Sequence, residues 1–259
     1  MHLHLFEFED FEWFPDIIRK GQTDYLHYMI NKFNIYKPAA GIIKDLMDNS
    51  GYNGILDLCS GGGGGMDLFQ TELMKITGKD IKITLSDKYP NIEAFEKIKE
   101  DTNGRVDFLK ESVDVLSVPE NSKCIRTVFS AFHHFKPDDA RSILKQAVDN
   151  NLPIAIFEGA AKDIKNFLGI LLFTPIIFLL ITPFMRPFKM SRIFFTYIIP
   201  LIPITTVWDG LVSILRMYTP DEMLGMANSV TQNGYVWKSG KVNNSIGTSI
   251  MYLTGYKSN

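Results

Sequence analysis

Five consecutive glycines, residues 61–65, follow directly on a short apolar run, residues 54–58 (GILDL). A segment with helical patterning, residues 66–76, comes immediately after them. Glycine has no Cβ, so its backbone can turn sharply and can lie directly against a ligand. A flexible linker is not expected between two apolar, structured segments. The glycine run therefore predicts a strand–loop–helix unit that holds a nucleotide-like cofactor.

The rest of the chain alternates between short apolar runs typical of buried strands and segments typical of helices. This alternation predicts an α/β fold with a doubly wound, mostly parallel seven-stranded sheet. The expected strands are residues 54–58, 81–86, 106–109, 125–130, 153–158, 235–242 and 248–256. The expected helices are residues 66–76, 91–100 and 137–150, an N-terminal helical cap over residues 1–50, and a helix that begins at the capping box 219–222.

Length, charge and cysteine content exclude several classes of protein. The chain has 259 residues, which is enough to bury a core without disulfide bonds, and its net charge of −2 gives no electrostatic footprint for nucleic acid. Cys59 and Cys124 are too few for a disulfide framework and cannot alone build a four-ligand metal site. With 46% apolar residues, the averages predict a reduced, cytosolic domain of the size of an enzyme, and no metal site is expected.

The residues around the glycines exclude two common phosphate-binding loops. A P-loop needs Lys and then Ser or Thr after the glycines, whereas Met66 and Asp67 follow here. A dinucleotide fingerprint needs a third glycine where Met66 or Leu68 stands. The remaining loop carries an acid, Asp57, in the strand that precedes it. An acidic loop repels a pyrophosphate but suits a ligand with a cationic amine.

Two further carboxylates follow the next two strands. Asp87 lies at the carboxyl end of the second strand, where it could accept hydrogen bonds from both hydroxyls of a ribose, or could cap a helix before Pro90. Asp114 follows the third strand, where it could read an adenine amino group or could be a simple turn acid.

With these acids the sequence resembles the class I S-adenosylmethionine-dependent methyltransferases. Their first motif is an acid followed by alternating glycines, and residues 57–63 (DLCSGGG) match it except that Cys59 replaces the first glycine. The turn then requires that Cys59 avoid positive φ. Residues 129–135 (FSAFHHF) also look like the family's segment after strand four, and the resemblance covers roughly residues 50–160 and 209–259.

The resemblance implies S-adenosylmethionine as cofactor and S-adenosylhomocysteine as product. It implies that Asp57 reaches the methionine amine through the loop, that Gly61 and Gly63 approach the cofactor, that Asp87 holds the ribose, and that Asp114 with Val115 flanks the adenine. The cofactor-binding residues expected on this basis are Asp57, Cys59, Ser60, Gly61, Gly63, Asp87, Asp114, Val115 and Ser130.

Residues in two other segments are candidates for contact with the cofactor or the acceptor. His133 or His134 could deprotonate an acceptor hydroxyl, or could be a structural histidine that caps the following helix. Arg19, Asp24 and Tyr25 could close over the methionine end of the cofactor, with Arg19 on its carboxylate, although a solvated helix face is the favoured interpretation.

The apolar residues are concentrated in one region, residues 166–208, which contains only three charges. All three are basic: Arg186, Lys189 and Arg192. The uncharged run 167–184 is long enough to be a candidate transmembrane helix. Three interpretations compete for this insertion: a soluble lid over an apolar pocket, a transmembrane hairpin, and an interfacial membrane element.

The strands before and after the insertion belong to one sheet, so a single crossing of a membrane is excluded. A hairpin would carry the three cations to the far side, against the positive-inside tendency. Pro175 and Pro183 would also kink a helix over 167–184. The sequence therefore favours an interfacial element over residues 167–208, with its cations at the cytoplasmic headgroups.

These features predict a methyltransferase that acts on a hydrophobic or lipid-like small molecule and lies at the cytoplasmic membrane face. The alternative is a membrane-associated binding or scaffold protein with the same fold and no catalysis, while methylation of nucleic acid is disfavoured because no basic face is evident. Trp208, Asp209 and Tyr218 are candidates for the acceptor side. The expected domains are the cap (1–50), the cofactor core (51–160), the apolar lid or membrane insertion (161–208) and a closing segment (209–259).

Overall fold

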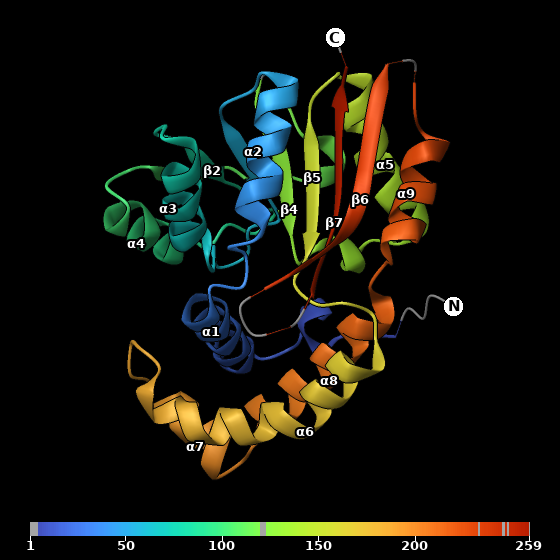
Figure 1. Cartoon of the computed structure of the whole chain (residues 1–259). Coiled ribbons are helices and arrows are strands. Elements are labelled where there is room, and N and C mark those ends of the chain that lie inside the picture. The colour runs from blue at the N-terminus through green and yellow to red at the C-terminus, as the bar shows by residue number, and fades with distance from the viewer. Residues whose placement is uncertain (1–4, 120–122, 233, 245–246, 248, 259) are drawn as a thin grey trace.

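The computed structural model describes residues 5–119, 123–232, 234–244, 247 and 249–258. Its centre is a seven-stranded sheet with the order β3-β2-β1-β4-β5-β7-β6 (Figure 1). The strands are β1 (Ile55–Leu58), β2 (Ile83–Leu85), β3 (Val106–Phe108), β4 (Ile125–Phe129), β5 (Ile154–Glu158), β6 (Tyr235–Asn243) and β7 (Ser249–Lys257).

The first five strands are parallel, and β7 runs antiparallel to both of its neighbours, β5 and β6. The predicted fold class is thereby confirmed. The strand order reverses between β1 and β4, and open α/β sheets bind their ligands at the carboxyl ends of the strands that flank such a reversal. The glycine loop leaves β1 at this place.

Helices cover both faces of the sheet, which explains why every residue of β1, β4 and β5 is buried. On one face, α2, α3 and α4 pack their apolar residues on the sheet, and α5 and α9 cover the other face. α2 therefore belongs to the layer over the sheet, although the sequence places it in an N-terminal cap. These helices are α2 (Ala39–Ser50), α3 (Met66–Thr77), α4 (Ile92–Asp101), α5 (Pro137–Asp149) and α9 (Pro220–Ser229).

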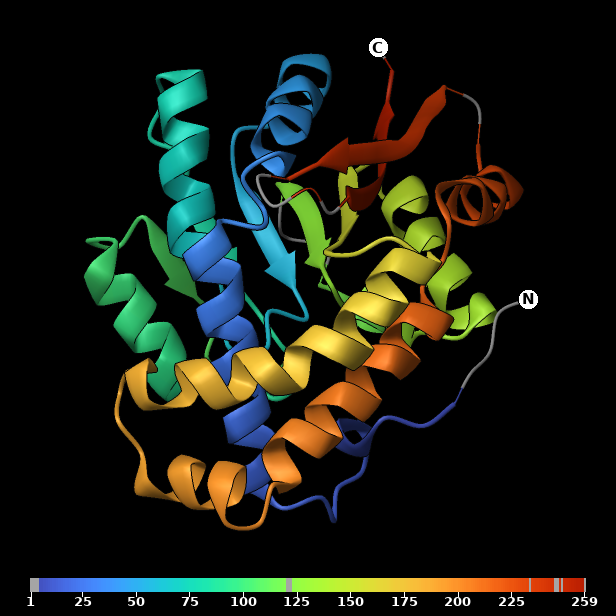
Figure 2. The same cartoon turned by 60° about the horizontal axis from the view of Figure 1, so that its bottom comes forward.

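The segment between β5 and α9 forms a separate helical layer beyond the carboxyl ends of the strands (Figures 1 and 2). We call residues 164–216 the apolar layer. It contains α6 (Ile164–Ile181), a 3-10 turn (Thr182–Phe184), α7 (Met190–Tyr197) and α8 (Leu201–Arg216). α6 continues through Pro175 and ends before Pro183. The predicted domain boundary at residue 208 falls inside α8. Asp209, the next residue, is buried in this helix and accepts hydrogen bonds from Phe8 and Gln22.

In the apolar layer, α6 turns a narrow stripe inward and a broad apolar face outward. Thr174, Phe178 and Thr182, four residues apart, are buried. Residues Ile164–Phe184 are long and apolar enough to cross a membrane, but only 17% of their most apolar window is buried. α7 and α8 pass the same test only as a pair that is bent by 76°. Exposed side chains of the layer include Ile164, Leu168, Leu172, Phe173, Ile176, Leu180, Phe184, Phe188, Met190, Phe194, Ile198 and Ile204.

α1 (Asp16–Phe33) lies between the apolar layer and the sheet domain (Figure 2). Tyr25 stacks on Phe178 of α6, with ring centroids 4.4 Å apart. Asp24 forms ion pairs with Lys189 and Arg192. These contacts hold α1 to the layer along one side of the helix.

Candidate functional site

The glycine loop is tied to the ends of β1 and β2 by hydrogen bonds. Ser60 N–H donates to the carbonyl of Ser86 (3.0 Å), and the Ser60 hydroxyl donates to the Asp57 carboxylate (2.6 Å). We expected Cys59 to avoid positive φ. This expectation is wrong, because Cys59 has a φ of 58°. The turn out of β1 imposes this left-handed conformation, which disfavours residues with a Cβ.

Asp57 is almost fully buried, and both of its carboxylate oxygens are used inside the protein. One accepts from Ser60 and the other accepts from the Thr127 hydroxyl (2.7 Å). Burial raises the pKa of Asp57 to about 7. Asp57 therefore fixes the loop to β4, and its action on a cofactor amine stays a prediction.

Asp87 follows β2 and lies beside the start of the glycine loop. Its carboxylate accepts hydrogen bonds from the N–H groups of Gly61 (2.8 Å) and Tyr89 (2.8 Å). Asn91, not Asp87, caps α4, so the alternative of a helix cap does not apply. A Cβ at Gly61 would meet no atom within 4 Å, so this side of the loop is open beside the Asp87 carboxylate.

Asp114 and Val115 lie after β3, as the sequence predicts. Asp114 accepts from the N–H of Leu116 and pairs with Lys88 (2.9 Å), and these two interactions hold the pKa of its carboxyl below the usual range. Val115 is buried in the core. The contact of either residue with an adenine stays a prediction.

The glycine loop borders a cavity of about 200 Å³. Asp57, Cys59, Ser60, Gly61, Gly63 and Ser130, six of the nine residues expected to bind the cofactor, line it. The Ser130 hydroxyl accepts from the Tyr36 hydroxyl (2.7 Å) and from the N–H of Gly159 (3.1 Å). The remaining lining residues are Glu9, Thr23, Leu26, His27, Ile30, Tyr36, Gly62, Gly64, Met66 and Phe129.

α1 covers this cavity with a face that the sequence reasoning missed. A Cβ at Gly64 would lie 3.3 Å from His27, and one at Gly65 would lie 2.5 Å from Ile30, so the glycines let α1 approach closely. Arg19, Asp24 and Tyr25, the residues expected here, do not line the cavity. The spacing of Thr23, Leu26, His27 and Ile30 places them on one helical face and could have revealed them.

The two histidines lie in a short 3-10 helix after β4 (Phe132–His134) and have different partners. His133 is buried, and Glu158 at the end of β5 accepts from its backbone N–H (2.9 Å) and contacts its Nδ1 (2.9 Å). His134 is partly exposed and lies 3.4–3.7 Å from Glu7, Glu9 and Asp10. Neither histidine caps α5, which begins at Pro137. Glu158 was missed, although an acid at the end of a central strand is a signal that could have found it.

The acids beside His134 belong to the N-terminal segment, residues 5–14. Burial raises the pKa of Glu7 to about 7, against the opposing effects of His134 and Arg216. Glu7, His133 and His134 each offer a metal-ligating type of atom within 4.8 Å of the others. The Arg216 guanidinium, 3.3 Å from Glu7 and 2.6 Å from Asp10, already supplies positive charge there.

The three residues expected on the acceptor side form hydrogen bonds to distant parts of the chain in this structure. Trp208 Nε1 donates to the carbonyl of Phe6 (3.0 Å). Asp209 accepts from the N–H of Phe8 (2.7 Å) and from the Gln22 amide (2.8 Å). The Tyr218 hydroxyl donates to the carbonyl of Phe135 (2.8 Å). Trp208 and Asp209 thus fasten the N-terminal segment to α8, and a contact with an acceptor stays a prediction for all three.

No protein-family model matches the sequence, and a comparison with curated proteins finds no match. Among solved structures, the chain is similar to the plantazolicin methyltransferase BpumL in complex with SAH, with a TM-score of 0.54 and 13% identity over 92% of this chain and 90% of that one. It is also similar to the pyocyanin biosynthetic protein PhzM (TM-score 0.50, 12% identity, 88% of this chain). Human N-acetylserotonin methyltransferase in complex with SAM gives a TM-score of 0.50 at 13% identity over 94% of this chain.

This chain spans 56% of the length of PhzM and 56% of that of the human enzyme. The sheet order, the glycine loop at the reversal of strand order and these similarities agree with one another. The chain has the fold of the class I S-adenosylmethionine-dependent methyltransferases.

Proposed function

We propose that the protein is an S-adenosylmethionine-dependent methyltransferase that acts on a hydrophobic or lipid-like small molecule. The observation that carries this proposal is the cavity between the glycine loop and α1. It lies where the strand order reverses and is bordered by Ser130, two residues before the helix of His133 and His134.

The residues of the cavity suit a cationic cofactor. Asp57 and Glu9 line it, and among the described residues no lysine or arginine does. This lining disfavours a pyrophosphate and suits a ligand with a sulfonium and an amine. Gly61 and Gly63 would approach the cofactor, Asp87 would hold its ribose, and Asp114 with Val115 would flank its adenine. When bound, S-adenosylmethionine supplies an electrophilic methyl group.

The chain's own residues would position the acceptor and take its proton. Methyl transfer depends mainly on alignment, and α1 with the N-terminal segment would keep water from the reacting atoms. His133 is buried and does not line the cavity, but Glu158 contacts its Nδ1 and would orient this imidazole, so His133 is the first candidate for a general base. His134 is the second candidate, since neighbouring Glu9 lines the cavity.

The apolar layer supports the choice of a hydrophobic acceptor and of a membrane location. A soluble monomer rarely exposes so large an apolar face, and such faces mark interaction sites. Residues 167–208 would lie in the boundary between headgroups and acyl chains at the cytoplasmic membrane face, and the acceptor would enter past them. We expect the bacterially expressed protein to partition with membranes and to be released by detergent.

Two measurements test the proposed activity. Calorimetry should show binding of S-adenosylmethionine and of S-adenosylhomocysteine, and labelled donor should transfer its methyl group to a component of a lipid extract. A protein that binds neither compound would contradict the enzyme. Binding without transfer to any hydrophobic acceptor would favour the alternative, a membrane-associated binding or scaffold protein.

A further inference from the structure

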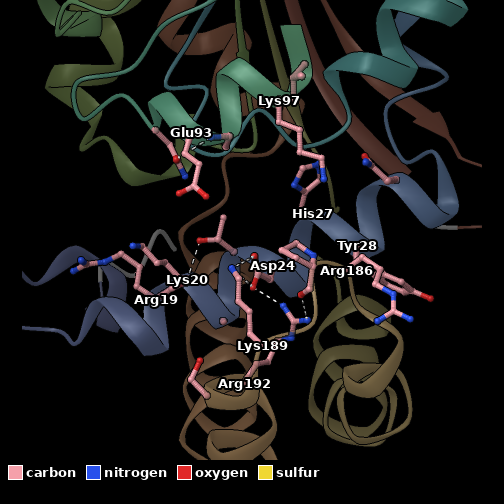
Figure 3. Close-up of a pocket in the computed structure, with 18 of the residues that line it drawn as sticks. Arg19, Lys20, Asp24, His27, Tyr28, Glu93, Lys97, Arg186, Lys189 and Arg192 are labelled. Atoms are coloured by element: carbon pink, nitrogen blue, oxygen red, sulfur yellow. Dashed lines mark hydrogen bonds and ion pairs between the residues drawn. The ribbon is translucent and has the colours of Figure 1, made fainter. Parts of the chain in front are cut away.

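A groove of about 1020 Å³ lies between α1, α4 and the loop that leads into α7 (Figure 3). It lies beside the cofactor cavity, because Thr23 and His27 line both. Unlike that cavity, the groove is lined by many charged side chains of both signs. None of the functions derived above uses them.

The charges of the groove are sorted between its two walls. The wall formed by α1 and residues 186–192, next to the apolar layer, carries six cations against two carboxylates, and the wall formed by α3 and α4 carries three carboxylates against one cation. In the first wall these residues are Arg19, Lys20, Lys32, Arg186, Lys189, Arg192, Asp16 and Asp24. In the second they are Asp67, Glu93, Asp101 and Lys97.

Some cations of this wall are already paired within the protein, and others are available to a ligand. Lys189 and Arg192 converge on Asp24 (2.9 and 2.6 Å), so this trio keeps a net positive charge (Figure 3). Arg192 is also buried and donates to the carbonyls of Met185 and Pro187. Lys20 and Arg186 are exposed, and within the described part of the chain neither has an ion-pair partner.

The cationic wall continues directly into the exposed apolar face. Phe184 lines the groove and is 70% exposed, and Phe188 and Met190 beside Lys189 are 50% and 70% exposed. α4, which carries two of the three carboxylates of the acidic wall, lies nearer to the sheet than α7 does (Figure 1). The cationic wall therefore adjoins the apolar layer, and the acidic wall lies across the groove from it.

We propose that this cationic wall binds the phosphate of an anionic phospholipid headgroup. This inference rests on the proposed contact between the apolar layer and a membrane. Lysine and arginine beside inserted apolar residues lie at headgroup depth, where phosphate is their natural partner. The site would thereby fix the orientation of the enzyme on the leaflet.

Vesicle flotation of the full chain tests the proposal. We expect tighter binding to vesicles of phosphatidylcholine with 30% phosphatidylglycerol than to phosphatidylcholine alone. The variant Lys20→Ala/Arg186→Ala should lose about fivefold in affinity per cation, about 25-fold in all, on the anionic vesicles only. The control Lys238→Ala/Lys241→Ala removes the same charge from exposed positions on the edge strand β6 and should change binding little.

Each contrary outcome has its own meaning. Equal binding to both vesicle types, or equal losses for the two double variants, would overturn the headgroup site and leave the membrane contact standing. If the protein bound neither vesicle type, both the membrane contact and this inference would be overturned. Stoichiometric binding of inorganic phosphate without a preference for anionic vesicles would overturn the lipid assignment.

Discussion

The sheet domain and the apolar layer are both rich in apolar residues, but they bury them to different extents. Every residue of β1, β4 and β5 is buried between helices of the same chain. In α6 the buried residues are confined to one stripe, and large aliphatic and aromatic side chains around it are exposed. The sheet domain thus buries its apolar residues within the chain, whereas the layer leaves a broad apolar face exposed, which is typical of an interaction surface.

Two phenylalanines of α6 test this division within a single helix. Phe178 is fully buried against Tyr25, and Phe173 is 60% exposed. Phe178→Ala should lower the free energy of unfolding by about 3–5 kcal/mol through loss of burial and creation of a cavity. Phe173→Ala should change it by less than about 0.5 kcal/mol. Urea unfolding without membranes measures both, and similar losses for the two variants would break the comparison.

Substitution of Asp87 should separate cofactor binding in the sheet domain from membrane contact in the layer. Asp87→Ala should weaken S-adenosylmethionine binding about 10- to 100-fold, the scale of hydrogen bonds to a charged group, and leave vesicle binding unchanged. Leu172→Glu/Leu180→Glu, on the exposed face of α6, should do the reverse. Calorimetry and flotation measure the two properties. Unchanged cofactor affinity in Asp87→Ala, with the exposed Asp80→Ala as control, would mean that Asp87 does not hold the ribose.

The pH dependence of stability compares a buried acid of the sheet domain, Asp57, with one of the N-terminal segment, Glu7, which pairs with Arg216 of the apolar layer. Burial raises the pKa of Asp57 from 3.8 to about 7, so between these values the folded protein keeps a proton that the unfolded chain has lost. Stability should therefore fall as the pH rises from about 4 to about 7, by up to about 1.4 kcal/mol per pH unit for one group. Glu7, at the junction with the layer, acts in the same direction because burial raises its pKa from 4.5 to about 7.

Asp57→Asn and Glu7→Gln should each flatten this slope, and the exposed Asp80→Asn should not. Urea unfolding at pH 5, 6 and 7 measures the effect. A slope that is unchanged in Asp57→Asn would show that this carboxyl titrates normally in the folded protein.

The smallest effect is expected at the turn out of β1. Cys59→Gly removes the cost of a positive φ, about 1–2 kcal/mol, but increases the freedom of the unfolded chain. We expect a net stabilisation of about 1 kcal/mol or less. Gly63→Ala should destabilise, because Gly63 has a φ of 68° and a Cβ there would lie 2.6 Å from Ile98. Thermal unfolding compares the two, and a destabilised Cys59→Gly would contradict the strain at this turn.

Local pattern was sufficient to predict the sheet, since strand and helix periods repeat within a few residues. The capping box at Thr219 and the glycine loop after β1 also carry their own signals. The missed features depend on contacts between distant parts of the chain. Asp209 is bound by the N–H of Phe8, 201 residues away, and Cys59 takes its φ from a turn that is fastened to β2. No periodicity within a segment records such pairings.

α1 is a wall shared by two sites, and this has a thermodynamic consequence. One face of this helix closes the glycine loop through Thr23, His27 and Ile30, while Asp24 and Tyr25 hold the apolar layer. A ligand that displaces the helix from the loop must also alter its contacts with the layer. A binding partner of the apolar layer that alters these contacts changes the affinity of the cavity for that ligand. By thermodynamic reciprocity, the ligand changes the affinity of the layer for the partner by the same factor. Binding of a ligand in the cavity and binding of a partner at the apolar layer are then linked equilibria.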